Sequence, residues 1–460
     1  MIGQELGKMV QDDSAMLTDG YRLTELGPLP EAWQVVRLGE VAEIGPARIP
    51  RENRNLIPFI PMAIIPENGV CISHWEMKSS EEIRSGIFIA EGDLLLAKIT
   101  PCLENGKQGI VTDIPGGWGY ASTEVFPIRS KGGILTEYLA LYLLQKEVRQ
   151  NLASKMEGTT GRQRLPKPVV VSLPIPLPPL AEQRAIAHVL RTVQRAQEAS
   201  ERVIAALKEL KKSLMRHLFT YGPVPVSVGT QDTVGTQDAV GAQRAVPLLQ
   251  DTEIGPLPAH WQVVRLGEVC EKSPQVVPAK MPNWQFKYVD VSCVDNSSLN
   301  IVDYQVLTGK EAPSRARKLI KTGDTIFATV RPYLKRIALV PPSLDGQICS
   351  TAFCVLSPKP EVDGSYLFYA VSRDEFVTSV AEYQRGSSYP AITDNDVLRG
   401  LIPLPPLPEQ HAIARMLQAV DRRIEAEEAS VRALEALFKT LLHELMTAKR
   451  RLPQEFIARF

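Results

Sequence analysis

The chain has 460 residues, with 52 basic and 52 acidic side chains and 44% hydrophobic residues. This length suits two or three domains, and the composition is that of a globular protein, which excludes bulk disorder. No apolar run reaches the roughly 18 residues of a membrane span, and the N-terminus lacks the apolar core of a signal peptide, so we expect a cytoplasmic protein with no membrane partner.

After an N-terminal extension, the chain opens with a segment that recurs later, so an internal duplication is the most informative feature. TELGPLPEAWQVVRLGEV at 24–41 matches TEIGPLPAHWQVVRLGEV at 252–269 at 15 of 18 positions. A second pair, IPLPPLAEQRAIAHVL at 175–190 and IPLPPLPEQHAIARML at 402–417, agrees at 12 of 16 positions. Between these anchors the copies diverge, which favours one scaffold that presents two different surfaces.

The interiors of both copies contain short β-branched segments bounded by Gly or Pro, which predict strands. These segments are 86–99, 107–114 and 122–128 in the first copy, and 324–333 and 336–342 in the second. One short helix is expected in each copy, at 136–152 and at 364–380. Each interior is therefore a strand-rich α+β domain.

After each Pro-rich anchor the apolar spacing alternates between four and three residues, which is typical of a coiled coil. A core helix packed on its own domain is the alternative, but two equivalent seams of about 40 residues favour a helix pair. Polar Gln197 and Ser200 interrupt the first seam and Glu427 the second, so we expect antiparallel helices with these midpoints opposed. The apolar seam residues are Ile186, Leu190, Val193, Ile204, Leu207, Leu214, Ile413, Leu417, Val420, Ile424, Val431, Leu434 and Leu441.

Three imperfect hexapeptides, VGTQDT, VGTQDA and VGAQRA, lie between the copies at 228–245. Their glycines and the flanking prolines predict a flexible linker rather than a helix. The expected order is an extension (1–23), a first domain (24–174), a helix (175–221), a linker (222–251), a second domain (252–401), a helix (402–449) and a tail (450–460).

The usual signs of catalysis are missing from the sequence. There is no Walker A loop, no Asn/Asp-Pro-Pro-Tyr, no Gly-rich cofactor loop and no Pro-Asp step of a nuclease motif. The six histidines lack metal-binding spacing, and the six cysteines form no Cys-x-x-Cys pair. We expect a non-catalytic chain with no metal or cofactor of its own.

Local basic clusters are the feature that points to nucleic acid, because the net charge does not. GTTGRQRLPK at 158–167 places Arg and Gln, whose shapes suit guanine and adenine edges, in a loop bounded by glycines. A solvated surface is the alternative. The candidate DNA contacts are Lys98, Thr159, Thr160, Arg162, Gln163, Arg164 and Lys167 in the first copy, and Arg331, Tyr333, Lys335, Arg336, Ser387, Ser388 and Tyr389 in the second.

The ordered set of motifs resembles the specificity subunits of type I restriction-modification systems, from residue 24 to about residue 449. The marks are PLPxxWxxxRLGEV at Pro28 and Pro256, Gly-Asp at Gly92 and Gly323, loops at Gly158 and Gly386, and IPLPPLxEQ at Ile175 and Ile402.

The resemblance implies an α+β fold with two strand-rich target recognition domains, separated by two long antiparallel coiled-coil helices in a pseudo-twofold internal repeat. Each domain would read one half of an asymmetric bipartite target in double-stranded DNA, and the helices would set the spacer. The implied partners are modification (methyltransferase) subunits, expected as two copies, and restriction (translocase and endonuclease) subunits. S-adenosylmethionine, ATP and Mg are expected on those partners.

Two other functions stay open from the residues alone. One is a duplicated protein-binding scaffold without DNA specificity, which salt-dependent and sequence-selective DNA binding would exclude. The other is a self-contained DNA enzyme, which assays of methyl transfer or cleavage by the chain alone would reveal.

Overall fold

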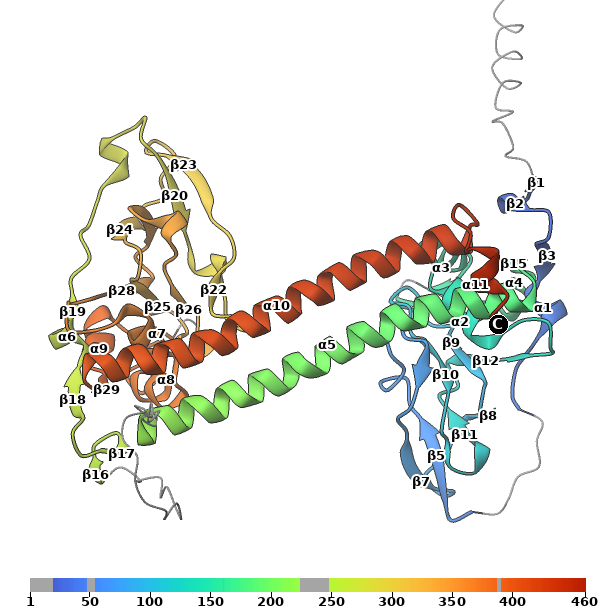
Figure 1. The fold of residues 1–460 in the computed structure, drawn as a ribbon, viewed down its shortest axis with the longest axis horizontal. Coiled ribbons are helices and arrows are strands. Elements are labelled where there is room, and N and C mark those ends of the chain that lie inside the picture. The colour runs from blue at the N-terminus through green and yellow to red at the C-terminus, as the bar shows by residue number, and fades with distance from the viewer. Residues whose placement is uncertain (1–19, 48–53, 160, 224–247, 387–389) are drawn as a thin grey trace, which may run out of the picture. The chain divides into compact units, whose positions relative to one another are not determined.

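The computed structural model describes residues 20–47, 54–159, 161–223, 248–386 and 390–460 (Figure 1). The chain divides into two compact units, Met1–Glu201 with Ala429–Phe460, and Arg202–Glu428. Each of the two long helices contributes one half to each unit. A unit therefore consists of one interior domain, the half-helix that follows it in the chain and a half-helix from the other copy.

The first unit begins with β1 (Tyr21–Thr24) paired to β2 (Gly27–Pro30), then β3 (Gln34–Arg37), α1 (Leu38–Val41) and β4 (Ala42–Ile44). A five-stranded sheet of order β4-β12-β9-β10-β6 adds β6 (Cys71–Ile72), β9 (Leu94–Ala97), β10 (Gln108–Val111) and β12 (Val125–Ser130). A four-stranded sheet of order β7-β5-β11-β8 holds β5 (Leu56–Ile60), β7 (Glu76–Ser79), β8 (Ile87–Ala90) and β11 (Trp118–Ala121). The strands predicted between residues 86 and 128 are confirmed.

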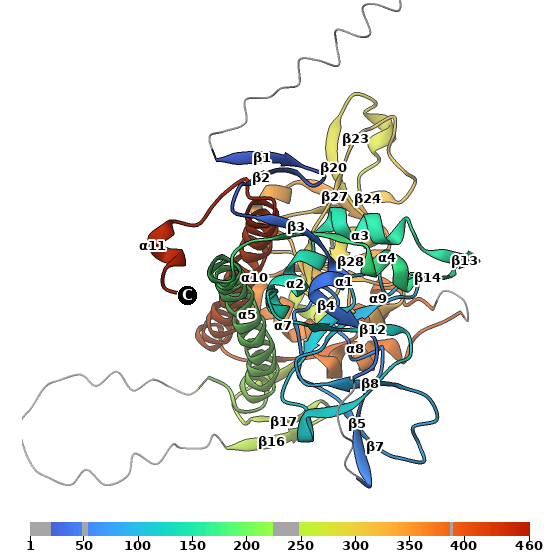
Figure 2. The same cartoon turned by 90° about the vertical axis from the view of Figure 1, so that its right-hand side faces the viewer.

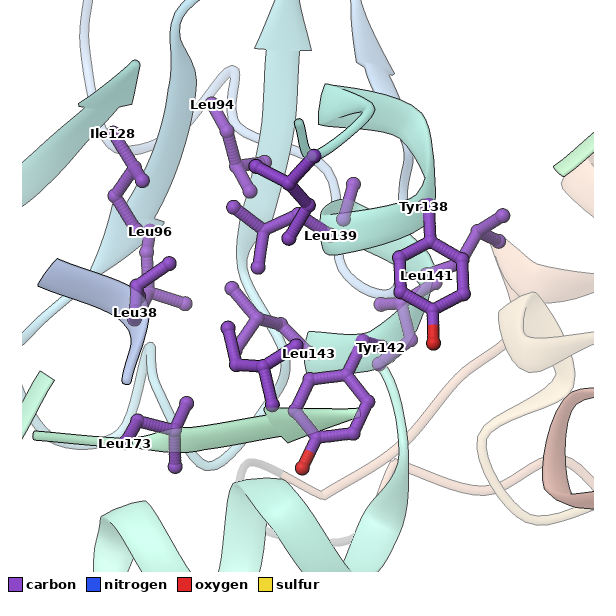
Figure 3. Packing of buried hydrophobic residues seen from close by; sticks show 14 of the residues in the cluster. Leu38, Leu94, Leu96, Ile128, Tyr138, Leu139, Leu141, Tyr142, Leu143 and Leu173 are labelled. Atoms are coloured by element: carbon purple, nitrogen blue, oxygen red, sulfur yellow. The ribbon is translucent and has the colours of Figure 1, made fainter. Parts of the chain in front are cut away.

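Strand β9 shows how this unit is layered. Its Leu94 and Leu96 belong to the core that reaches the helices, whereas Leu95 belongs to the core between the two sheets. Successive side chains of a strand point to opposite faces, so one strand serves both cores. Figure 3 shows Leu94, Leu96 and Ile128 gathered with the helical residues of the first core.

The single helix expected over 136–152 is in fact two helices, α2 (Thr136–Leu143) and α3 (Lys146–Ala153), separated at Gln145, which has an extended backbone. Tyr138 to Leu143 are all buried in α2, but α3 buries only Leu152. The first helix is mostly buried and the second lies at the surface, and the break between them allows the chain to change direction. The same correction holds in the second unit, where α7 (Gly364–Ser372) and α8 (Asp374–Ala381) meet at Arg373.

The first interior ends with β13 (Glu157–Thr159), β14 (Arg162–Arg164), α4 (Lys167–Val171) and β15 (Pro174–Leu177). Strand β15 pairs antiparallel with β3, with Ile175 opposite Val36. The two sequence anchors of the first copy are thus neighbours in one small sheet, although they lie far apart in the chain.

The second unit repeats this plan. Its opening elements are β16 (Leu249–Thr252), β17 (Gly255–Pro258), β18 (Gln262–Arg265), α6 (Leu266–Val269) and β19 (Cys270–Glu271). Its sheets have the orders β19-β28-β25-β26 and β23-β20-β27-β24, built from β20 (Gln285–Val289), β23 (Gln305–Thr308), β24 (Ala316–Ile320), β25 (Thr325–Ala328), β26 (Ile337–Leu339), β27 (Gln347–Ser350) and β28 (Phe353–Pro358). A short pair β21 (Val294–Asp295) and β22 (Asn300–Ile301), then α9 (Asp394–Leu398) and β29 (Leu401–Leu404), complete it. The strands predicted at 324–333 and 336–342 are confirmed as β25 and β26.

The repeated Trp and Glu of the anchors form one hydrogen bond in each unit. Trp33 donates its indole N–H to Glu182 Oε2 at 2.9 Å, and Trp261 donates to Glu409 Oε2 at 2.9 Å. In the first unit Arg451, from the C-terminal tail, donates to both oxygens of Glu182 at 3.0 Å. In each unit this glutamate, which is buried as Glu182 and half-buried as Glu409, ties the start of the long helix to the start of its repeat.

The two long helices are α5 (Leu180–Tyr221) and α10 (Leu407–Met446). In the first unit Ile186 and Leu190 share a core with Leu442 and Leu445, so the start of α5 packs on the end of α10. In the second unit Leu218 shares a core with Ile413 and Leu417, so the end of α5 packs on the start of α10. The helices are antiparallel, and every predicted seam residue is buried or half-buried. The expected fold class is confirmed.

The expected register of this pair, with Gln197 and Ser200 near Glu427, is wrong. In the second unit Lys208 Nζ lies 3.1 Å from Glu428 Oε1, and residue 208 is 11 positions along α5 from residue 197. That separation is about 16 Å of helix. In the first unit Gln197 lines the same cavity as Glu435 and Phe438.

Two segments fall largely outside the described residues. The hexapeptides at 228–245 and residues 1–19 of the expected extension are not among them. The tail is described and includes α11 (Gln454–Ile457), which lies beside the start of α5 (Figure 2). There Arg184 donates to the carbonyl of Phe460 at 3.2 Å.

Candidate nucleic-acid interface

The candidate loop of the first unit is an antiparallel hairpin, β13–β14, in which Thr159 lies opposite Arg162 and Glu157 opposite Arg164. Figure 2 shows it at the margin of the unit, next to α4. The tight turn requires glycine, because Gly161 has a φ of +81°. Thr160 lies outside the described residues.

Two backbone hydrogen bonds fasten this hairpin to segment 98–100, and a third fastens that segment to Glu124. The Leu165 N–H donates to Lys98 O at 2.8 Å, and the Thr100 N–H donates to Gln163 O at 3.1 Å. The Lys98 N–H donates to Glu124 O at 3.0 Å. Segments from three distant parts of the sequence therefore meet in one small area, which we call the first reading frame: residues 98–100, 122–124 and 162–165.

Arg164 is exposed and forms the tightest side-chain contact of the first reading frame. Its Nε lies 3.0 Å from Glu124 Oε2, and its Nη2 lies 2.8 Å from Glu124 Oε1. The guanidinium, as hydrogen-bond donor, holds the pKa of the Glu124 carboxyl below its ordinary value, and Glu124 in turn raises the pKa of Arg164.

The other predicted contacts of the first unit have different surroundings. Arg162 is exposed and has no hydrogen-bond or ion-pair partner among the described residues, whereas Gln163 is half-buried. Lys98 is half-buried, with its Nζ 5.1 Å from the centre of the Phe126 ring. Lys167 is exposed at the start of α4. The structure brings Lys98, Gln163 and Arg164 together with Thr159 and Arg162 on the hairpin.

The second unit contains an equivalent arrangement, the second reading frame: residues 329–331, 350–352 and 390–392. The Ile392 N–H donates to Thr329 O at 2.9 Å, the Arg331 N–H to Pro390 O at 2.8 Å, and the Thr329 N–H to Ala352 O at 2.8 Å. These bonds repeat those of the first frame one for one. Ser387, Ser388 and Tyr389 fall outside the described residues.

Three members of the second candidate set lie on a tight turn that begins at the end of segment 329–331. Arg331 and Lys335 flank a 3-10 turn at Pro332–Leu334, with φ values of +49° and +51°. Such values are uncommon for non-glycine residues and often accompany functional sites. Tyr333 within the turn is 52% exposed.

Lys335 and the last described candidate of the second unit, Arg336, are engaged within the fold. Lys335 Nζ pairs with Asp374 and lines a cavity of about 640 Å³ beside α5 and α10. Arg336 donates to the carbonyls of Val291 and Val294, at 2.7 and 3.1 Å. The sequence grouped both with Arg331 because of their positive charge. In the structure Lys335 contacts the start of α8 through Asp374, and Arg336 contacts the backbone of residues 291 and 294.

Sequence reasoning missed Glu124 as part of the site. Both copies carry Ser-Thr at this place, at 122–123 and at 350–351, and the following residue is Glu124 in one copy and Ala352 in the other. In both copies the N–H of this residue meets the serine hydroxyl, at 3.2 and 3.3 Å. A change of residue type inside a repeated turn was the available signal.

The described residues contain neither a membrane-spanning helix nor a cluster suited to a metal ion. None of the helices there is long and apolar enough to cross a membrane. No cluster of His, Cys, Asp and Glu suited to a metal ion occurs in the same part of the chain.

Comparison with known proteins gives one consistent result. The family model described as the type I restriction modification DNA specificity domain matches residues 30–209 and again residues 258–436. The type I restriction enzyme MjaVIII specificity subunit of Methanocaldococcus jannaschii is 24% identical over 440 residues, which cover 92% of this chain and 93% of that protein. The EcoAI specificity subunit of Escherichia coli is 34% identical over 160 residues, 34% of this chain and 27% of that protein.

The fold has solved counterparts. The crystal structure of a type I restriction-modification system S subunit from M. genitalium aligns with a TM-score of 0.52 and 12% identity, over 90% of this chain and 96% of that one. A structure from work on complex assembly and conformational transition of the type I R-M system aligns with a TM-score of 0.51 and 22% identity, over 91% and 98%. At these identities the likeness concerns the fold.

Proposed function

The chain belongs to the family of type I restriction-modification DNA specificity proteins, and from this premise we propose how its two units share the recognition of one DNA target. The first unit reads one half of a bipartite sequence and the second unit reads the other half. The two halves differ in sequence, so the target is asymmetric, and the long helices set the spacer between them.

One observation supports this division most strongly. The two reading frames repeat the same three backbone hydrogen bonds, but the side chains mounted on them differ. The first carries Arg162, Gln163 and Arg164 on a hairpin, and the second carries Arg331, with Tyr333 on the 3-10 turn that follows it. A shared frame with different hydrogen-bonding groups is what two unequal half-sites require.

The helices also offer equivalent surfaces for partner subunits. Leu210 of α5 in the second unit and Leu437 of α10 in the first unit are 52% and 45% exposed and occupy corresponding positions of the repeat. Exposed leucines on paired helices suit the apolar face of another helix. We propose that each one anchors a modification subunit, which gives two such subunits for each specificity chain, and that restriction subunits join this assembly in the cytoplasm.

In this proposal the chain itself does no chemistry. S-adenosylmethionine belongs to the modification subunits, and ATP and Mg to the restriction subunits. The specificity chain selects the DNA sequence and positions the other subunits on it.

Mapping of methylated bases in cells that carry the system tests the division of labour. We expect Arg162→Ala combined with Arg164→Ala to weaken recognition of one half-site only, and Tyr333→Ala to weaken only the other. Each lost base contact should cost about 1 to 3 kcal/mol. If both variants altered the same half-site, or neither changed the methylated sequence, the proposal would be wrong.

A further inference from the structure

We propose that Glu124 is a positioning residue for base recognition, which holds the Arg164 guanidinium so that its outer edge reads a guanine in the first half-site. This inference rests on the proposed function, because it requires the β13–β14 hairpin to face DNA. It adds the base that is read, the atoms that read it and the residue that orients them.

The contact between the two side chains determines which part of the guanidinium stays available. Glu124 engages the Nε side of Arg164, through Nε to Oε2 at 3.0 Å and Nη2 to Oε1 at 2.8 Å. A guanidinium has five N–H groups in one plane. The Nε–H and one N–H of Nη2 are used, so the edge formed by Nη1 and the second N–H of Nη2 remains open. Two parallel donors at that spacing match O6 and N7 of guanine.

Both partners are held by the backbone, so the open edge has a defined direction. Arg164 lies between two neighbours in the sheet, Glu157 of β13 and Ile99 of the segment after β9. Glu124 accepts from the Lys98 N–H through its carbonyl and donates its own N–H to Ser122 Oγ. A long arginine side chain normally loses rotamer freedom when it binds, and an arginine already held in place loses less.

The exposure of the two side chains is consistent with an arginine that contacts DNA. The Arg164 side chain is 53% exposed and the Glu124 side chain 27% exposed. Glu124 is thus the more buried member of the pair, and its charge is neutralised by Arg164, whose side chain remains accessible to solvent. The hydrogen bonds from Arg164 keep the pKa of Glu124 low, so the carboxylate stays ionised at neutral pH.

A scaffold ion pair is the simpler explanation, and the second unit argues against it. The repeat places Ala352 where the first unit has Glu124, and Ala391 where it has Arg164. The backbone bonds of the two frames are nonetheless the same, at 3.0 and 2.8 Å for the bond to residue 124 or 352. The backbone arrangement therefore forms without a Glu–Arg pair, which is present at these positions in the first unit and absent from them in the second.

The test uses the specificity chain assembled with its modification subunits. The probe is a library of DNA duplexes randomised in the first half-site, with the second half-site kept constant. Methyl transfer from S-adenosylmethionine selects the accepted sequences, which are then sequenced. For the unaltered chain we expect one position where guanine is strongly preferred and whose preference depends on Arg164.

Three variants separate the contributions. Arg164→Ala should reduce the guanine preference at that one position on the order of 10- to 100-fold. Glu124→Ala should reduce it several-fold at the same position, and the near-isosteric Glu124→Gln should retain part of it. Arg162→Ala is the matched control on the same strand. Because Arg162 has no partner to orient it among the described residues, it should weaken all sequences alike.

The possible failures are distinguishable. If Arg164→Ala weakened every sequence equally, Arg164 would contact phosphate and the inference would fail, while the DNA-facing hairpin of the proposed function would stand. If Arg164→Ala changed neither preference nor affinity, the hairpin would leave the interface and both would fail. If Glu124→Ala matched the unaltered chain, Glu124 would have no positioning role. A second library, randomised in the second half-site with the first kept constant, serves as the folding control: unchanged selection from it would show that each variant is folded and assembled.

Discussion

The Gly-Asp pairs that mark both copies of the repeat form tight turns. Gly92 and Gly323 have φ values of +84° and +86°, which L-residues rarely adopt. Asp93 Oδ2 accepts the N–H of Ala90 at 2.9 Å, and Asp324 Oδ2 accepts the N–H of Lys321 at 2.8 Å. Burial raises the pKa of both carboxyls above the ordinary value of 3.8.

These raised pKa values give a prediction about stability and pH. A buried carboxyl with a raised pKa binds its proton more tightly in the folded state than in the unfolded state. The free energy of unfolding therefore falls as pH rises from the ordinary pKa through the raised one, by at most about 1.4 kcal/mol per pH unit for each group. We expect Asp93→Asn to remove this contribution from the first unit.

Thermal unfolding at a series of pH values from about 4 to about 7 would measure the effect. Asp324→Asn should act in the same way on the second unit, and exposed Asp303→Asn is the control that should leave the curve unchanged. A steeper decline for Asp93→Asn than for the unaltered chain would contradict the expected sign of the pH dependence.

Sequence reasoning found half of the Glu124–Arg164 pair. The basic hairpin was visible because Arg, Gln and Gly stand together in one segment. Its partner is 40 positions away in the chain, and the contact exists only because β9, β12 and β14 bring the segments together. Spacing within a sequence does not encode such a contact, so a fold is needed to find it.

For the long helices, the apolar period predicted the seam but not its register. The seam follows from burial, and each position with apolar spacing is at least half-buried. The polar residues do not pair across the helices as expected. Gln197 donates to Glu201 at 2.9 Å and Glu427 pairs with Arg423 at 2.5 Å, each within its own helix. Because these polar side chains form their contacts within their own helix, they do not determine the register of the helix pair.

The exposed positions of the same helices lead to a prediction about assembly. Replacement of Leu210 or Leu437 by Lys puts a charge where an apolar partner surface is expected. Burial of a leucine at an interface contributes about 2 kcal/mol, so each change should cost about that much in partner affinity. We expect each single variant to lose one of the two modification subunits, and the double variant to lose both.

Co-purification with a tagged modification subunit, followed by mass measurement of the complex, would show the stoichiometry. Leu56→Lys is the matched control, because Leu56 is 54% exposed but lies in β5 of the first interior domain. Full assembly of both helix variants, or an equal loss in the control, would remove these leucines from the proposed docking surfaces.

At the scale of the whole molecule, the duplication predicted most of the fold. Two matched anchors fix where each repeat begins and ends, and the structure joins them through β3 with β15 and β18 with β29. The repeat could not predict that each compact unit takes half of a helix from the other copy. That arrangement follows from the packing of apolar seams, which places the start of one helix against the end of the other.

The duplication also leads to the last prediction, that base preference can be moved from one unit to the other. Because the two reading frames share their backbone hydrogen bonds, a Glu and an Arg introduced at positions 352 and 391 should meet as Glu124 and Arg164 do. We expect Ala352→Glu with Ala391→Arg to create a several-fold guanine preference at one position of the second half-site. The gain should be smaller than the native one, because Ala352 is only 8% exposed and its surroundings must adjust.

The measurement is methyl-transfer selection from duplexes randomised in the second half-site, with the first half-site kept constant. Ala391→Arg alone is the control, because an arginine without its carboxylate is not oriented and should favour all sequences alike through phosphate. Unchanged selection from a second library, randomised in the first half-site, shows that the double variant is folded and assembled. If the double and single variants then selected the same sequences, the Glu–Arg pair would not be what confers base preference on a shared frame.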